Sequence, residues 1–182
     1  MKPTFKDLTN YLVALGTTDV AHTGKGYLAH AIGVYNIMKA WNCSEDLCNA
    51  ALFHSIYGTQ QFQGFTLPVE QRSELQTLIG GYAEKIAYIN CFMDRSSLDN
   101  QLADDKESYP LIHRESGEEM ALPKAEYDDL VRLHLFDWLE QVERSQGWDQ
   151  RRAAYRGMAE RLGGPALEAY DGVFAKEPTQ VA

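Results

Sequence analysis

The sequence predicts an all-α protein built as a single domain. Apolar side chains recur at helical spacing in one segment after another, and glycine or proline separates most of these segments. The chain has 182 residues, of which 45% are hydrophobic and 24% are charged, which is the size and composition of one globular domain. We therefore expect one bundle of about seven to eight helices over residues 1–182.

The first three predicted helices follow one another closely. Apolar residues recur at helical spacing from Leu8, and Gly16 ends that segment before a glycine-rich connector over residues 22–26. Ser44 is a suitable N-cap for the third helix. That helix ends in the run 50–54, which is so apolar that we expect it to be deeply buried. The three helices are expected over residues 8–15, 27–41 and 45–55.

A polar loop and two further helices come next. Residues 57–66 are rich in Gln, Gly and Thr and predict a loop. Pro68 suits the first turn of a helix that extends to residue 79, where the pair Gly80-Gly81 breaks it. A fifth helix over residues 82–93 carries apolar side chains at helical spacing.

The second half begins with a polar excursion over residues 96–122, which holds many acidic residues and short apolar groups. We interpret it as a small hairpin or lid and not as a domain boundary. Pro123 opens a long amphipathic helix that Gly147 ends. Two more helices are expected over residues 149–162 and 165–174, so the C-terminal helices occupy about 149–175 and the core of the domain about 20–145.

The net charge disfavours two classes of partner. Lys and Arg number 17 against 26 Asp and Glu, which gives a formal charge of −9. An acidic surface repels nucleic acid and anionic membranes, so we expect neither as a partner. No apolar run approaches the roughly 20 residues that span a bilayer. We expect a small-molecule substrate, and the sequence leaves the oligomeric state open, a homodimer included.

The cysteines indicate the compartment. Cys43, Cys48 and Cys91 are three in number and include no CxxC pair. An odd set of this kind is typical of reduced thiols and not of a disulfide framework or a zinc ribbon. The first residues lack the basic and then apolar pattern of a signal peptide. Together these observations predict a cytoplasmic protein.

Two histidines and one aspartate form the leading candidate for a metal site. His30 lies on the second predicted helix and His54 ends the very apolar third one, where an imidazole needs a partner or a metal. In an antiparallel helical hairpin, a residue near the start of one helix faces a residue near the end of the next. Asp137 lies among apolar residues of the long helix. Two imidazoles and one carboxylate from three helices suit a divalent transition metal.

Other interpretations of these residues remain open. His30 and His54 are alternatively core histidines bonded to backbone carbonyls. Asp94 is a rival carboxylate, although the neighbouring Arg95 favours a local ion pair there. His134 precedes Asp137 by one helical turn and shares its face, where we expect it to be partly exposed or to support a ligand.

The motifs around these residues resemble the HD-domain metal-dependent phosphohydrolases. The segments GKGYLAH at 24–30 and AALFH at 50–54 are similar to the opening of the hydrolase domain of alarmone (guanosine tetraphosphate) synthetase/hydrolases. Residues 79–89 resemble the segment that follows the His-Asp pair in that family, and LFDWL at 135–139 matches the stretch that holds its last metal aspartate. The similarity covers about residues 20–145 and implies an HD-like helical bundle with metal ligands at His30, His54 and Asp137.

The chain departs from that pattern at one ligand. Ser55 stands where the HD pair has its aspartate, and the acidic pair that follows in alarmone hydrolases is absent. The run 53–59, with the sequence FHSIYGT, resembles the hallmark of an HD-like variant family. A neutral serine is a weak ligand, so the resemblance implies one divalent ion (Mn, Fe or Zn) and not two. It permits hydrolysis, and also an iron oxygenase of the inositol oxygenase kind.

Four further residues are candidates for substrate contact. Two glycines in the connector would allow His22 to fold back toward the pocket. Ser55, Tyr57 and Thr59 follow the second metal histidine, where groups that line a pocket are expected. Our leading hypothesis is a metal-dependent hydrolase of a small anionic, phosphorylated or similar molecule. A mononuclear non-haem iron oxygenase and a metal-free HD-like domain that binds a ligand or protein are the alternatives.

Overall fold

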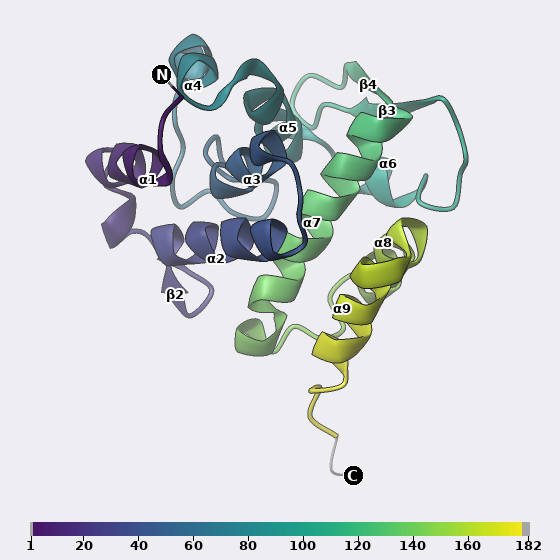
Figure 1. Ribbon diagram of the computed structural model, residues 1–182. Helices are drawn as coiled ribbons and strands as arrows, with labels where there is room; N and C mark the ends of the chain where they lie inside the picture. Colours follow the sequence, from purple (N-terminus) through teal and green to yellow (C-terminus); the bar gives the residue numbers. More distant parts are fainter. Residues whose placement is uncertain (1, 180–182) are drawn as a thin grey trace.

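The computed structural model describes residues 2–179 and confirms the all-α prediction (Figure 1). Nine α-helices, two short 3₁₀ helices and two small two-stranded antiparallel sheets lie within these residues. The helices are α1 (Phe5–Ala14), α2 (Tyr27–Ala40), α3 (Glu45–Leu52), α4 (Arg72–Ile79), α5 (Gly81–Phe92), α6 (Arg95–Asp99), α7 (Lys124–Ser145), α8 (Arg152–Leu162) and α9 (Gly164–Phe174). The 3₁₀ helices are η1 (Thr17–Asp19) and η2 (Val69–Gln71), and the strands are β1 (Ala21–His22), β2 (Lys25–Gly26), β3 (Ser108–Ile112) and β4 (Glu119–Pro123).

Side-chain caps fix several of these helix starts. Thr4 and Asp7 form a reciprocal capping box at the start of α1, since each side chain binds the backbone N–H of the other. Ser44 accepts a hydrogen bond from the Leu47 N–H and caps α3 as expected. Pro123 immediately precedes α7.

The long helix α7 organises the domain. It packs against α2, α3 and α5 on one side and against α8 and α9 on the other, and it crosses the middle of the molecule (Figure 1). Half of its 22 residues are buried, and most of these are Leu, Val, Phe and Trp side chains between Leu130 and Val142. The polar residues on its buried face, His134 and Asp137, are therefore held in the core, where their partners decide their charge states.

The predicted polar excursion contains a hairpin and an additional short helix. Strands β3 and β4 pair in register from Ser108 opposite Pro123 to Ile112 opposite Glu119. The ring of Tyr109 stacks on Tyr127 of α7 with centroids 4.0 Å apart, which fastens the hairpin to the core. The helix α6 precedes the hairpin, and it raises the count above the expected seven to eight.

A tight turn between β1 and β2 brings His22 toward α2. Ala21 pairs with Gly26 and His22 with Lys25. Gly24 has a φ of 73°, a left-handed conformation that glycine adopts without strain. The connector therefore folds back on the bundle, as its two glycines suggest.

The third helix ends earlier than its sequence predicts. It stops at Leu52, three residues short of the expected Ser55, and the backbone of residues 53–57 continues in tight turns. None of the helices within residues 2–179 combines the length and apolar character that a membrane span requires.

Candidate metal centre

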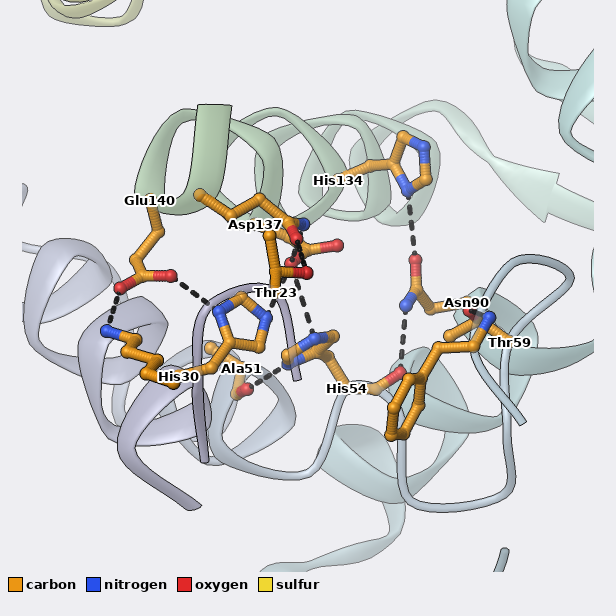
Figure 2. A network of polar contacts seen from close by, with 12 residues as sticks. Thr23, His30, Ala51, His54, Thr59, Asn90, His134, Asp137 and Glu140 are labelled. Carbon is orange, nitrogen blue, oxygen red and sulfur yellow. Dashed lines mark hydrogen bonds and ion pairs between the residues drawn. The ribbon is translucent and has the colours of Figure 1, made fainter. Parts of the chain in front are cut away.

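His30, His54 and Asp137 converge from three separate segments of the chain. Nε2 of His30 lies 2.9 Å from Oδ1 of Asp137, and Nε2 of His54 lies 3.4 Å from the same oxygen. One ligand atom of each residue lies within 4.8 Å of the other two, and all three side chains are buried. Figure 2 shows the two imidazoles next to one another, both directed at the Asp137 carboxylate on α7. The structure thus brings together the three predicted ligands.

Partners on the outer side of each imidazole set its tautomer. Nδ1 of His30 donates to Oε2 of Glu140 at 2.5 Å, and Nδ1 of His54 donates to the backbone carbonyl of Ala51 at 2.7 Å (Figure 2). In the neutral form, each ring therefore directs the lone pair of Nε2 toward Asp137. Histidines that bind metals are commonly held in this way by a carboxylate or carbonyl behind them.

The site favours a positive charge at its centre. Burial alone would lower the pKa of His30, but hydrogen bonds to Asp137 and Glu140 raise it to about 9. Burial would raise the pKa of Asp137, yet His54 and His30 hold it well below its usual value. Two lone pairs and a carboxylate that face one another need a cation between them, either a proton or a metal ion.

The spacing of these atoms suits a divalent ion. Ligand atoms about 2.1 Å from one ion lie roughly 3.0 to 3.4 Å apart in octahedral or tetrahedral coordination. The two nitrogen–oxygen separations in the structure, 2.9 and 3.4 Å, fall close to that range. The set of two imidazoles and one carboxylate can therefore hold a divalent metal ion and leaves coordination positions open for water or substrate.

Glu140 is held in place by charge and by packing. Lys25 and Arg144 both form ion pairs with its carboxylate, and together with His30 they lower its pKa to about 2 against the effect of burial. A Cβ atom on Gly33 of α2 would stand only 2.6 Å from Oε1 of Glu140. Glycine at position 33 thus leaves room for the Glu140 carboxylate between α2 and α7.

A polar chain supports the segment that carries His54. Asn90 donates from Nδ2 to the His54 carbonyl at 2.8 Å, and its Oδ1 lies 3.2 Å from Nδ1 of His134 (Figure 2). Nε2 of His134 accepts a hydrogen bond from Arg151 at 2.7 Å. Burial and the charges of Arg95 and Arg151 lower the pKa of His134, so it stays neutral. His134 is 1% exposed, which differs from the expected partly exposed position, and it supports the site through Asn90.

A cavity of about 160 Å³ opens beside the three ligands. His22, Ser55 and Thr59 line it together with His54 and Asp137. The His22 ring stacks on His30 with centroids 4.2 Å apart, and its Nδ1 and the Ser55 hydroxyl have no hydrogen-bond partner within residues 2–179. The Thr59 hydroxyl accepts hydrogen bonds from two backbone N–H groups of its own loop. Three of the four expected substrate-contact residues therefore do border the candidate site.

The fourth of these residues, Tyr57, lies elsewhere. Its hydroxyl donates to Glu84 at 2.9 Å, and Arg72 and Gln76 bind the same carboxylate. Tyr57 is not among the residues that line the cavity. The structure places it in a buried polar cluster with Glu84 of α5 and Arg72 and Gln76 of α4.

Arg95 also lines the cavity, although the sequence gives it no role at the site. It is 8% exposed and lines the cavity with His54 and Asp137. The expected ion pair with Asp94 does not form, because the Asp94 carboxylate instead caps α6 through the N–H and hydroxyl of Ser96. Sequence proximity suggested a surface pair, whereas the first turn of α6 directs the arginine inward.

A larger groove of about 710 Å³ lies between α6, α7 and α8. Its charged groups are mostly paired: Lys124 with Asp105, and Arg161 with Asp128. Nothing in it converges on a point in the way that the three metal-ligand candidates do.

The comparisons with known proteins give one match. Residues 11–95 are similar to a family model described as a domain of unknown function (DUF6817). This stretch includes His30, His54 and Arg95, whereas Asp137 and Glu140 lie beyond it on α7. Neither a curated protein nor a solved structure matches the chain.

Proposed function

We propose that this protein is a metal-dependent hydrolase with an HD-like helical fold that acts on a small anionic molecule. The observation that carries the proposal is the convergence of His30, His54 and Asp137. A hydrogen bond to Glu140 orients the His30 ring, and one to the Ala51 carbonyl orients the His54 ring. One divalent ion, Mn, Fe or Zn, fits a set of three protein ligands better than two ions do, because Ser55 replaces the expected second carboxylate.

The roles of the surrounding side chains follow from their contacts. His30, His54 and Asp137 would hold the divalent ion, which would supply Lewis acidity to a bound water. Glu140 keeps the His30 ring in the orientation and tautomer that direct Nε2 inward. His22 and Ser55 each offer the cavity a buried polar atom with no partner in residues 2–179, and we assign them to substrate contact.

A second candidate is supported by the same ligand set. Two histidines and one carboxylate with open positions are also typical of mononuclear non-haem iron(II) oxygenases. Such an enzyme would use His30, His54 and Asp137 unchanged but would require oxygen and iron. The third interpretation, a metal-free domain that binds a ligand or protein, requires that the centre takes a proton in place of a metal.

Turnover under controlled metal and oxygen distinguishes these candidates. The full chain would be loaded with Mn²⁺, Fe²⁺ or Zn²⁺ and incubated with a panel of small phosphomonoesters, phosphodiesters and carboxylic esters, in air and anaerobically. We expect hydrolysis that continues without oxygen and is lost in Asp137→Asn. Oxygen consumption that requires Fe²⁺ would support the oxygenase instead. A protein that binds metal but turns over nothing in either atmosphere would contradict both enzyme proposals.

A further inference from the structure

Arg95 carries a buried charge that the protein itself does not neutralise. The side chain is 8% exposed, and its Nε is enclosed without a hydrogen-bond partner. Within residues 2–179, its guanidinium forms no hydrogen bond and no ion pair, whereas its backbone N–H donates to the Gln60 side chain at 3.1 Å. A guanidinium stays charged in proteins, so this arrangement places an uncompensated cation inside the domain.

The nearest carboxylates are all engaged elsewhere. Asp99 is bound at both oxygens by Arg151, at 3.0 and 2.5 Å. Asp94 caps α6. Asp137 faces the two imidazoles and accepts a hydrogen bond from Gln141 at 3.1 Å. Asp137 and Asp99 act on Arg95 through space but neither bonds it, so an anion from outside the chain would stabilise the buried guanidinium.

Arg95 also stands where two cavities meet. It lines the inner cavity of about 160 Å³ with His54 and Asp137. It also lines an outer cavity of about 450 Å³, which is bordered as well by Gln60, Gln61, Asp94, Ser96, Asp99 and Arg151. Gln61 and Arg95 are the two residues common to both. An anion bound to Arg95 would therefore lie between the candidate metal centre and the outer space.

We propose that Arg95 binds an oxyanion group, a phosphoryl or a carboxylate, of the molecule on which the metal centre acts. The planar guanidinium offers parallel N–H donors that match two oxygens of such a group. The small inner cavity takes the reacting part, and the outer cavity leaves room for the rest of the molecule. This inference rests on the proposed function only because it treats the bound molecule as a substrate. The oxyanion site itself can be tested without turnover.

Binding of simple oxyanions tests the site directly. Inorganic phosphate and acetate would be titrated by calorimetry into the full chain, as purified and after chelator treatment, so that anion bound to metal is separated from anion bound to Arg95. We expect Arg95→Gln to weaken binding about tenfold or more. Arg156→Gln, which removes an exposed arginine on α8, should leave binding within about twofold. Tighter binding of phosphate than of acetate would indicate a substrate with a phosphoryl group. Tighter binding of acetate would indicate a substrate with a carboxylate.

A stability measurement separates a binding role from a structural one. If Arg95 is held uncompensated for a ligand, the apolar variant Arg95→Met should raise the melting temperature of the ligand-free protein by about 2 °C or more. A lower melting temperature would mean that Arg95 supports the fold, and would overturn the proposal. Equal anion binding in wild type and Arg95→Gln, or none in wild type, would also overturn it. Loss of metal binding with Arg95-dependent phosphate binding retained would refute the proposed hydrolase alone.

Discussion

Oε2 of Glu140 accepts a hydrogen bond from Nδ1 of His30 at 2.5 Å, and this contact determines what the opposite nitrogen of the ring can do. With Nδ1 committed to Glu140, Nε2 is the atom that faces Asp137 at 2.9 Å. The Glu140 carboxylate therefore fixes one ligand of the candidate metal centre without entering it.

Removing the charge of Glu140 should weaken metal binding while the fold is kept. We expect Glu140→Gln to reduce the affinity for Mn²⁺ or Zn²⁺ roughly 10- to 100-fold, because His30 loses the anionic partner that orients it and makes it a stronger donor. Equilibrium dialysis with metal analysis measures the effect. Glu143→Gln is the matched control, since Glu143 lies one turn on and pairs with Lys176 at the surface. Equal affinities for the two variants would contradict this role.

Gly33 should be as sensitive as Glu140 although it carries no side chain. In Gly33→Ala the new methyl group would lie 2.6 Å from Oε1 of Glu140, so the carboxylate must move away from His30. We expect a loss of metal affinity of about tenfold. Gly172→Ala is the control, because nothing lies within 4 Å of its Cβ position in α9. That control should stabilise the protein slightly, as alanine does in helices. Unchanged metal affinity in Gly33→Ala would show that α2 and α7 tolerate the methyl group.

The buried carboxylate of Glu84 should make the unfolding free energy depend on pH. Burial raises its pKa, but hydrogen bonds from Arg72, Gln76 and Tyr57 lower it below the usual 4.5. A carboxyl with a depressed pKa in the folded state stabilises the fold above its unfolded pKa and loses that contribution as pH falls through the folded value. Wild type should therefore exceed Glu84→Gln in unfolding free energy by about 2 kcal/mol at neutral pH, since Arg72 remains partly hydrated.

Urea unfolding at several pH values measures that difference. The advantage of wild type should be constant above about pH 5 and shrink below it. A difference that does not change between pH 7 and pH 3 would mean that the Glu84 cluster does not depend on the carboxylate charge.

Tyr57 should prove structural and not catalytic. Its hydroxyl donates to Glu84 and lies outside the cavity lining, so Tyr57→Phe removes one buried hydrogen bond. We expect a loss of about 1 kcal/mol in unfolding free energy with metal affinity unchanged. Calorimetric unfolding of the variant tests the loss of stability, and metal titration of the same sample tests the unchanged metal affinity. A large drop in metal affinity without a drop in stability would show that Tyr57 acts at the candidate metal centre.

The fold class follows from local patterns, and the same patterns single out His30, His54 and Asp137 as residues that need partners. Helical spacing with Gly and Pro boundaries located most helices within a few residues, as with the helix expected over 123–146 and observed as α7 (Lys124–Ser145). His30, His54 and Asp137 were each polar residues in apolar surroundings, and such residues must find partners in the core.

The rest depended on contacts between distant segments. Glu140 has the pattern of one more acidic residue of a long amphipathic helix, yet Lys25 of β2 and His30 of α2 contact it from 115 and 110 residues away. Arg95 was assigned to its sequence neighbour Asp94 because the direction of a side chain in a short helix cannot be read from composition. Helix α3 ends at Leu52, and the Ala51 carbonyl in its last turn accepts a hydrogen bond from the His54 ring, a contact with no sequence signature.

The central claim is that His30, His54 and Asp137 hold one divalent metal ion, and metal stoichiometry tests it most directly. The full chain would be purified without chelator and then dialysed against Mn²⁺, Zn²⁺ or, anaerobically, Fe²⁺. We predict one ion per chain in wild type and at least a roughly 100-fold loss of affinity in His54→Ala and Asp137→Asn, with helical circular dichroism retained. No stoichiometric ion in wild type, or equal binding in these variants, would contradict the account.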